Sequence, residues 1–238
     1  MINKIINYIN TKGSIKAKYN GIYFNTFKMI SHIKKLGINP VTFIDVGANR
    51  GMLSKTVNYL FPECKIYCFE PIQSCFNELL NLEKTTSNLK VFNCAISDFI
   101  GEAEFNESEY DYSSSLLKMA EKHKIAFPQT KSISTYKVNV YKLDYFNNQM
   151  KLNPPVMLKL DVQGAELNVI RGADRILEKV DFILCELSIS ELYINQPLVS
   201  DIIIKLKEKG FYLFDIIELN RDPKNSELLQ FDALFKKL

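Results

Sequence analysis

The stretch Val41-Thr-Phe-Ile-Asp-Val-Gly-Ala-Asn-Arg-Gly51 decides the fold of this chain. Its apolar run, Val41–Val46, is typical of a short buried strand, and it stops in a turn bounded by Gly47 and Gly51. The amphipathic segment that follows, Gly51–Tyr59, is predicted to be a helix. This order of strand, glycine turn and helix begins an alternation that continues along the chain.

Strand-like and helix-like segments alternate after this turn. Apolar runs typical of buried strands are 65–69, 89–94, 156–160 and 182–186, and the helical segments include 165–177 and 198–209. Such alternation predicts an α/β fold with a doubly wound, mostly parallel sheet. The last two strands, 211–215 and 229–235, have no helix between them and predict an antiparallel C-terminal hairpin; 101–105 is a strand outside the alternation. We expect a Rossmann-like sheet of seven strands.

Residues 1–40 are predicted to be an N-terminal helical extension, and residues 41–238 the main domain. Two apolar stripes at helical spacing indicate the extension, and the second stripe ends at Gly37. The stripes are Ile2, Ile5, Ile6 and Ile9, followed by Phe27, Ile30, Ile33 and Leu36. We expect a helical cap packed on the main domain. The alternative is a membrane-surface helix or a dimerisation helix, the latter implying a homodimer.

Charge and cysteine content exclude several classes of protein. The net charge is only +3, and four of the 30 basic residues are arginine, so we expect no nucleic-acid partner. No apolar run reaches the ~18–20 residues of a transmembrane segment. Five scattered cysteines indicate a reduced, cytoplasmic protein, and the abundance of Lys, Asn and Ile is typical of a bacterial source. His32 and His123 lie in Lys-rich segments and are expected at the surface, which argues against zinc.

Carboxylates stand at the ends of four of the predicted strands. They are Asp45, Glu70, Asp161 and Glu186. Because the carboxyl ends of parallel strands share one edge of the sheet, we expect these groups to lie close together. A buried carboxylate is unfavourable unless it contacts a ligand, a backbone amide or a cation. Four of them therefore predict a binding site at this edge.

The glycine turn does not match the common nucleotide-binding fingerprints. A dinucleotide site needs glycines at positions 47, 49 and 52, but the chain has Asn49 and Met52, and no Lys-Ser/Thr pair follows Gly51. Glu70 ends the second strand, 19 residues after Gly51, where an acid can accept hydrogen bonds from the ribose of an adenosine-bearing ligand. The alternative is an ordinary tight turn with a capping carboxylate.

Several motifs, in this order, carry a resemblance to a known family. They include Asp45-Val-Gly-Ala-Asn-x-Gly51, Phe69-Glu70-Pro71, Asn93-x-Ala95-x-Ser97-Asp98 and Lys159-x-Asp161-Val-Gln-Gly-Ala-Glu166. From Gly37 to the C-terminus the chain resembles the FkbM family of S-adenosylmethionine-dependent methyltransferases, which have the class I methyltransferase fold. The resemblance implies an O-methyltransferase that acts on a sugar hydroxyl of a surface glycan or its precursor. Gln163 stands where the family more often has an acid.

The resemblance also implies the residues that bind the cofactor, S-adenosylmethionine. Its methionine part would lie on Asp45, Gly47, Ala48, Asn49 and Gly51, its ribose on Glu70, and its adenine edge near Asn93, Ala95, Ser97 and Asp98. Asp161 would end its strand beside the sulfonium and the methyl acceptor. Two other functions remain open. One is a nicotinamide-dependent oxidoreductase, against which Asn49 argues, and the other is a non-catalytic binding domain.

The candidate catalytic residues are Lys159, Asp161 and Glu186. Lys159 and Asp161 lie two apart on one strand and project from the same face, and Glu186 ends the neighbouring strand. A hydroxyl that is methylated must lose its proton, and a carboxylate can accept it. Asp161 and Glu186 could share either this proton or a divalent cation such as Mg²⁺. For Lys159 the alternative is a buried ion pair with Asp161 or Glu166.

An irregular excursion, 110–137, is the expected place for the methyl acceptor, a small molecule or a glycan. Long excursions between strands commonly carry substrate-binding residues. Tyrosine rings can cover the apolar faces of a sugar, while serine and glutamine meet its hydroxyls. The candidates are Tyr112 and Ser115 in the excursion, and Tyr193 and Gln196 after the fifth strand. We expect both segments to lie over the carboxyl edge of the sheet.

Overall fold

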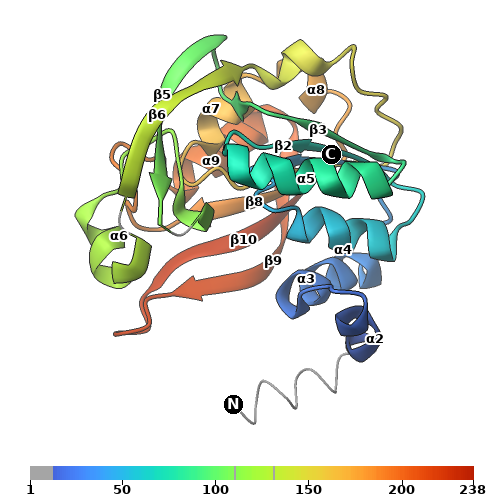
Figure 1. Cartoon of the computed structure of the whole chain (residues 1–238), viewed down its shortest axis with the longest axis horizontal. Helices are drawn as coiled ribbons and strands as arrows, with labels where there is room; N and C mark the ends of the chain where they lie inside the picture. The colour runs from blue at the N-terminus through green and yellow to red at the C-terminus, as the bar shows by residue number, and fades with distance from the viewer. Residues whose placement is uncertain (1–12, 110, 131) are drawn as a thin grey trace.

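The computed structural model describes residues 13–109, 111–130 and 132–238. Within them, seven strands form one sheet in the order β3-β2-β1-β7-β8-β10-β9 (Figure 1). Their bounds are β1 Thr42–Val46, β2 Lys65–Phe69, β3 Leu89–Phe92, β7 Val156–Leu160, β8 Phe182–Ser188, β9 Phe211–Arg221 and β10 Leu228–Lys237. The first five run parallel, and β10 is antiparallel to both β8 and β9. The predicted seven-stranded sheet with its C-terminal hairpin is confirmed.

Helices cover both faces of this sheet, with α4 and α5 in front and α7 and α9 behind in Figure 1. The helices are α2 Ser14–Tyr19, α3 Phe24–Lys35, α4 Met52–Leu60, α5 Gln73–Thr85, α6 Glu121–Ala126, α7 Glu166–Arg171, α8 Asp174–Leu177 and α9 Val199–Glu208, with 3₁₀ turns η1 Asp111–Ser113, η2 Pro128–Thr130 and η3 Leu143–Phe146. The expected single helix over 165–177 is thus divided into α7 and α8. A side chain at Gly172, between them, would lie 2.1 Å from the Ser97 carbonyl oxygen, so this residue packs against another segment instead of continuing the helix.

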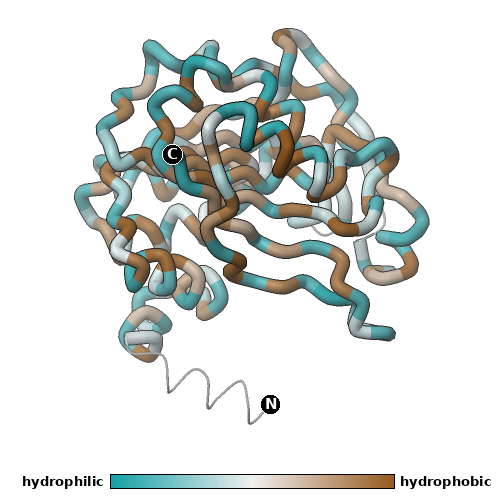
Figure 2. Tube along the Cα trace, turned by 180° about the vertical axis from the view of Figure 1, so that it is seen from behind, coloured by the Kyte–Doolittle hydropathy of each residue, from teal (hydrophilic) through white to brown (hydrophobic). Residues whose placement is uncertain are grey.

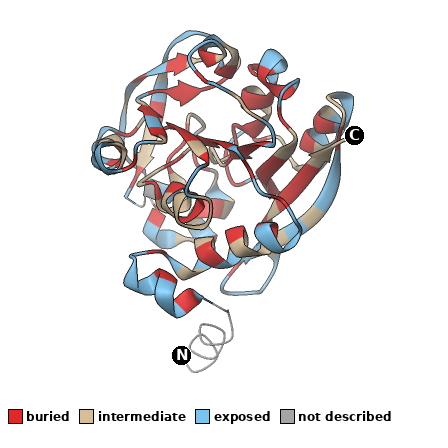
Figure 3. Ribbon diagram, turned by 90° about the vertical axis from the view of Figure 1, so that its right-hand side faces the viewer, coloured by how far each residue is buried: buried red, intermediate tan, exposed pale blue. Residues whose placement is uncertain are grey.

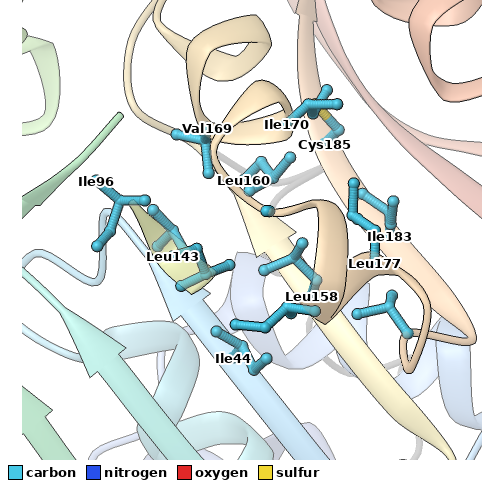
Figure 4. Close-up of a cluster of buried hydrophobic side chains, with 14 of the residues drawn as sticks. Ile44, Ile96, Leu143, Leu158, Leu160, Val169, Ile170, Leu177, Ile183 and Cys185 are labelled. Atoms are coloured by element: carbon cyan, nitrogen blue, oxygen red, sulfur yellow. The ribbon is translucent and has the colours of Figure 1, made fainter. Parts of the chain in front are cut away.

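Successive side chains of the strands point to opposite faces of the sheet and pack into two separate apolar layers. In β1, Phe43 packs with residues of α3, α4 and α5, whereas Ile44 packs with residues of α7, α8 and α9. Figure 4 shows Ile44 and Leu158 in the second layer, facing Val169 and Leu177. Hydrophobic residues accordingly concentrate along the strands (Figure 2), and the helices bury one side and expose the other (Figure 3). A strand buried on both faces explains the continuous apolar runs in the sequence.

The N-terminal region contributes α3 to the first layer. This helix buries Phe27, Ile30 and Ile33, while Leu36 lies just beyond its end and is exposed. The first apolar stripe of the sequence, at residues 2–9, lies outside the described residues. Division of the chain at residue 40 into an extension and a main domain stays a prediction. Among the described residues, no helix has the length and apolar character that crossing a membrane requires.

A second, three-stranded sheet stands beside the first. Its order is β4 Ala95–Ile96, β6 Ser132–Tyr141 and β5 Gly101–Ser108, which includes the expected strand at 101–105. The irregular excursion is therefore shorter than predicted, because 132–137 belong to β6. Only Val138 and Val140 of its described side chains are fully buried, and the Ser, Thr and Lys residues before them conceal the strand pattern. The described part of the remaining excursion, 111–130, carries η1, α6 and η2.

Candidate active site

A cavity of about 360 Å³ opens at the carboxyl ends of β1, β2, β7 and β8. One part is bounded by the glycine turn after β1, by Glu70 and by the segment that enters β4. The other part is bounded by Asp161, Glu186 and the excursion 111–130. Its volume lies within the range of small-molecule sites. The cavity lies at the edge where the sequence places its four carboxylates.

The glycine turn is shaped by two close approaches. Gly47 has φ +79°, and a Cβ there would lie 1.9 Å from the carbonyl oxygen of Asp161 at the end of β7. Gly51 has φ +74°, and a Cβ there would lie 2.7 Å from Leu79 of α5. Both positions favour glycine for their left-handed backbone, and Gly47 also needs it for space, because its neighbour is a backbone atom that cannot move aside as the Leu79 side chain can. Gly47 and Asn49 line the cavity, whereas Ala48 and Gly51 do not.

Glu70 fastens the glycine turn to the end of β2. Its carboxylate accepts the backbone N–H of Asn49 and that of Ile72, each at 2.8 Å. Burial raises the pKa of Glu70 to about 7, although the two backbone hydrogen bonds oppose this shift. A carboxylate offers about four acceptor positions, so two remain on a side chain that lines the cavity. Glu70 is placed to accept hydrogen bonds from a ligand.

Asp45 and Lys159 lie beneath the turn rather than in the cavity wall. Asp45 is fully buried and accepts the Ser54 hydroxyl at 2.6 Å. Its other carboxylate oxygen has no hydrogen-bond partner in the described part of the chain and lies 3.3 Å from Lys159 Nζ. Lys159 donates to the carbonyl oxygen of Gly47 at 2.7 Å, and its Nζ lies 3.4 Å from Asp161. Burial opposes the charge of Lys159, but Asp161 and Asp45 outweigh it and raise its pKa. This cation braces the turn, and its carboxylate partners are Asp45 and Asp161.

Of the residues expected near an adenine, the cavity wall includes Ala95, flanked by Cys94 and Ile96. Asn93 lies outside the wall and donates to the carbonyl oxygens of Glu70 and Pro71. Ser97 and Asp98 are also outside it, since the chain turns at β4 into the second sheet and carries Ser97 against Gly172. The order of motifs along the sequence gives no sign of this departure from the first sheet.

Gln163 joins the two candidate catalytic carboxylates. Its side-chain nitrogen donates to Asp161 at 2.7 Å and to Glu186 at 2.9 Å. Gln230 donates to the same oxygen of Glu186 at 2.8 Å. Burial raises the pKa of Glu186 well above its ordinary value, and repulsion from Asp161 and Asp232 raises it further. The two carboxylates thus converge in the cavity as expected, through an amide that sequence reasoning assigned no role.

This arrangement does not fit a divalent cation. The group between Asp161 and Glu186 is the amide nitrogen of Gln163, a hydrogen-bond donor and not a metal ligand. Within the described parts of the chain, no three His, Cys, Asp or Glu side chains are grouped so that they could hold a metal ion. The side chains around Asp161 and Glu186 therefore do not support a bound divalent cation.

The four residues proposed to contact the methyl acceptor have different surroundings. Tyr112 lines the cavity, and its hydroxyl lies 3.3 Å from Met52 Sδ. Tyr193 is buried behind the wall, with its hydroxyl 2.9 Å from Gln163 Oε1 and 3.1 Å from the Ser113 carbonyl oxygen. Gln196 accepts the N–H groups of Leu192 and Tyr193, and Ser115 donates to the Gln163 carbonyl oxygen at 2.7 Å. Tyr193, Gln196 and Ser115 support the turn after β7.

The expectation that His123 lies at the surface is wrong. His123 is only 3% exposed and lines the cavity from α6, and its burial lowers its pKa to about 4. Lys122 and Lys124 on either side of it are partly exposed and form ion pairs with Glu227 and Glu121, which gives the segment its misleading polar character. His32, in contrast, is partly exposed and pairs with Asp215 at 2.7 Å.

Comparison with known proteins agrees with this architecture. Residues 45–213 match the model of the methyltransferase FkbM domain. The 2-O-methyltransferase NoeI of Sinorhizobium fredii is 29% identical over 165 residues, which are 66% of this chain and 67% of that protein. Methyltransferase sdnD of Sordaria araneosa is 26% identical, over 60% of this chain and 63% of its own length.

A solved structure has the same fold. The methyltransferase FkbM of Methylobacillus flagellatus superposes with a TM-score of 0.53 and 13% identity, covering 90% of this chain. This chain spans about half the length of that protein, 49%. At this identity the likeness extends to the fold alone, whereas the family match covers more than half of the chain and includes the turn after β1 and the end of β7. This chain belongs to the FkbM methyltransferase family.

Proposed function

We propose that this protein transfers a methyl group from S-adenosylmethionine to a hydroxyl oxygen of a small polyhydroxylated acceptor, a sugar or a glycan precursor. The observation that carries this proposal is Glu70 at the end of β2, facing a cavity that the glycine turn also lines. Family membership and the name of the 29% identical relative, a 2-O-methyltransferase, support the same reaction.

The residues present fit the cofactor. Glu70 would receive the two ribose hydroxyls on the acceptor positions that its backbone partners leave open. Cys94, Ala95 and Ile96 supply an apolar wall for the adenine, and the backbone near Gly47 would meet the methionine part. Asn93, Ser97 and Asp98 would act from outside the wall, through the backbone of this segment.

Asp161 and the groups beside it would then carry out the methyl transfer. S-adenosylmethionine supplies a methyl group that is already activated by its sulfonium, so the protein chiefly aligns the attacking oxygen and receives its proton. Burial and the charge of Asp161 favour the neutral form of Glu186, which makes Glu186 the less suitable proton acceptor. We assign the proton to Asp161, held by Lys159 on one side and by Gln163 on the other.

The wall beyond Asp161 favours a hydroxylated acceptor. Tyr112 and Phe127 line the cavity together with Asn220 and Gln230, whose amides hydrogen-bond to each other. Aromatic faces with amide groups between them suit a sugar, which has apolar faces and a rim of hydroxyls. The five cysteines are buried and form no disulfide, which supports a reducing location such as the cytoplasm.

Calorimetric titration with S-adenosylhomocysteine, S-adenosylmethionine and NAD tests the first step. We expect binding of the first two and none of NAD. Transfer of a labelled methyl group to a panel of methyl glycosides tests the second. Binding of NAD alone would contradict the proposal and favour the oxidoreductase alternative.

A further inference from the structure

His123 is a buried polar side chain in the cavity wall, and it is the residue of α6 that lines the cavity. Both ring nitrogens are shielded from solvent, and among the residues that the structure describes neither has a hydrogen-bond partner. Buried polar side chains in native proteins are nearly always hydrogen-bonded, so an imidazole with two open positions needs an explanation.

The ring is held in place by its neighbours. Its centroid lies 5.3 Å from that of Phe127 and 5.2 Å from that of Tyr193, each in an edge-to-face arrangement. The helix is anchored by Lys122, which donates to Ser190 at 2.8 Å and to Glu227 at 2.6 Å. The bridge between Met119 and Tyr193 fixes the approach to the helix. The ring therefore keeps one position, as a binding group must.

The surroundings connect this ring to the candidate catalytic carboxylates. Tyr193 packs against His123 and contacts Gln163, and Gln163 donates to Asp161 and to Glu186. His123, Asp161 and Glu186 also line the same cavity, so one molecule bound there can contact the imidazole and the carboxylate pair. Because burial keeps the imidazole neutral at ordinary pH, it offers one N–H donor and one acceptor nitrogen. A hydroxyl group can pair with either of them.

We infer that His123 hydrogen-bonds a hydroxyl of the molecule that receives the methyl group. This inference rests on the proposed function and narrows it. The methyl acceptor is a polyhydroxylated molecule, with one hydroxyl directed to Asp161 and a second one held by His123. An acceptor with a single hydroxyl leaves the imidazole unpaired and binds more weakly.

Ring-labelled histidine makes this inference measurable, because the chain has only two histidines. In the protein saturated with S-adenosylhomocysteine, methyl glycosides of several hexoses are titrated and the two histidine signals are followed by NMR. We expect at least one glycoside to shift the His123 signal and to leave that of His32, which pairs with Asp215 on the surface, unchanged. The variant His123→Gln assigns the signals.

Affinity measurements separate a binding role from a packing role. For a glycoside that binds, His123→Phe should weaken its affinity at least about tenfold and leave that of S-adenosylhomocysteine unchanged, with partial recovery in His123→Gln. Removing the relevant hydroxyl from the glycoside should weaken binding to the wild type but add no further loss in His123→Phe. Lys124→Ala, on the solvent side of α6, is the matched control and should behave as wild type.

Two results overturn the inference. One is a panel in which every glycoside that binds leaves the His123 signal unmoved, and the other is a panel in which no glycoside binds. Failure of the wild type to bind S-adenosylmethionine and S-adenosylhomocysteine overturns the proposed function instead, so the two failures are distinguishable.

Discussion

Gly47 and Asp161 lie so close that a Cβ on the glycine would be 1.9 Å from the aspartate's carbonyl oxygen. The ends of β1 and β7 meet at this point, and the cavity opens beside it. The relationship links the glycine turn to the candidate catalytic strand, because the two backbones leave no room for a side chain at position 47.

Gly47→Ala should therefore destabilise the protein by more than its backbone conformation alone accounts for. The left-handed conformation costs about 1–2 kcal/mol for a residue with a side chain, and the contact with Asp161 adds to it. Gly210→Ala is the matched control, because Gly210 has φ +83° with no atom within 4 Å of an added Cβ. Urea denaturation of the two variants makes the comparison. Equal losses of unfolding free energy would mean that the backbone relaxes around the contact.

Glu70→Gln should bind S-adenosylhomocysteine more weakly, by about 1.5–3 kcal/mol, because a charged acceptor for the ribose hydroxyls is lost. Glutamine keeps one oxygen for the N–H of Asn49 or Ile72, so the turn is less disturbed than by alanine. Glu78→Gln is the control, since Glu78 pairs with Arg50 at the surface, outside the cavity. Calorimetry measures both, and an unchanged affinity in Glu70→Gln would remove Glu70 from the ribose site.

Asp161→Asn should keep cofactor binding and lose about 10²–10⁴-fold in methyl transfer, because a positioned general base contributes that much. Lys159 retains Asp45 as a partner in this variant, so the turn stays braced. Single-turnover transfer of a labelled methyl group gives the rate, and calorimetry gives the cofactor affinity. Full activity of this variant would assign the proton to another group.

Asp232→Asn should stabilise the protein at pH 8 and have little effect near pH 4. Burial raises the pKa of Asp232 to about 7, and Asp161 contributes to this shift. An unfolded aspartate ionises near pH 4, so the folded protein binds more protons between about pH 4 and 7, and its stability falls as the pH rises through this window. Asparagine does not ionise, so the variant does not lose stability in this pH window through position 232. Unfolding free energies at the two pH values test the prediction.

A surface aspartate provides the control of opposite sign. The hydrogen bond from Lys209 lowers the pKa of Asp174, so its ionised form is the favoured one in the folded state. Asp174→Asn should therefore leave the protein no more stable at pH 8 than wild type. A gain in both variants at pH 8 would indicate a general effect of removing negative charge.

Tyr112 and Tyr193 are equivalent candidates in the sequence, but we expect Tyr112→Ala and Tyr193→Phe to have different effects. Tyr112 lines the cavity and is exposed, so its removal should raise KM for the methyl acceptor with little change in stability. Tyr193 is buried, and loss of its hydroxyl contacts with Ser113 and Gln163 should lower stability by about 1 kcal/mol. Acceptor kinetics and thermal unfolding of both variants decide between these roles. Interchanged effects would contradict the assignment.

Much of the candidate site around the glycine turn can be predicted from the sequence, because it depends on the order of strands and turns along the chain. When two successive strands pair in parallel, the turn after the first strand and the carboxylate at the end of the second lie at the same edge of the sheet. Glu70, Asp161 and Glu186 lie at the cavity for this reason. The same logic fails at Ser97 and Asp98, where the chain leaves the first sheet for the second.

The sequence by itself determined the seven-stranded sheet, the hairpin at its edge and the carboxylates at its strand ends, because periodicity and chain order act locally. Only the tertiary structure decided which polar side chains face the cavity. His123 turns inward from a Lys-rich helix, and Tyr193 lies behind the wall that Tyr112 lines. Such choices depend on packing between segments far apart in the chain, as with Tyr193 and Gln163, 30 residues apart. The sequence around a hydroxyl or an imidazole group does not reveal whether that group contacts water, another side chain or a ligand.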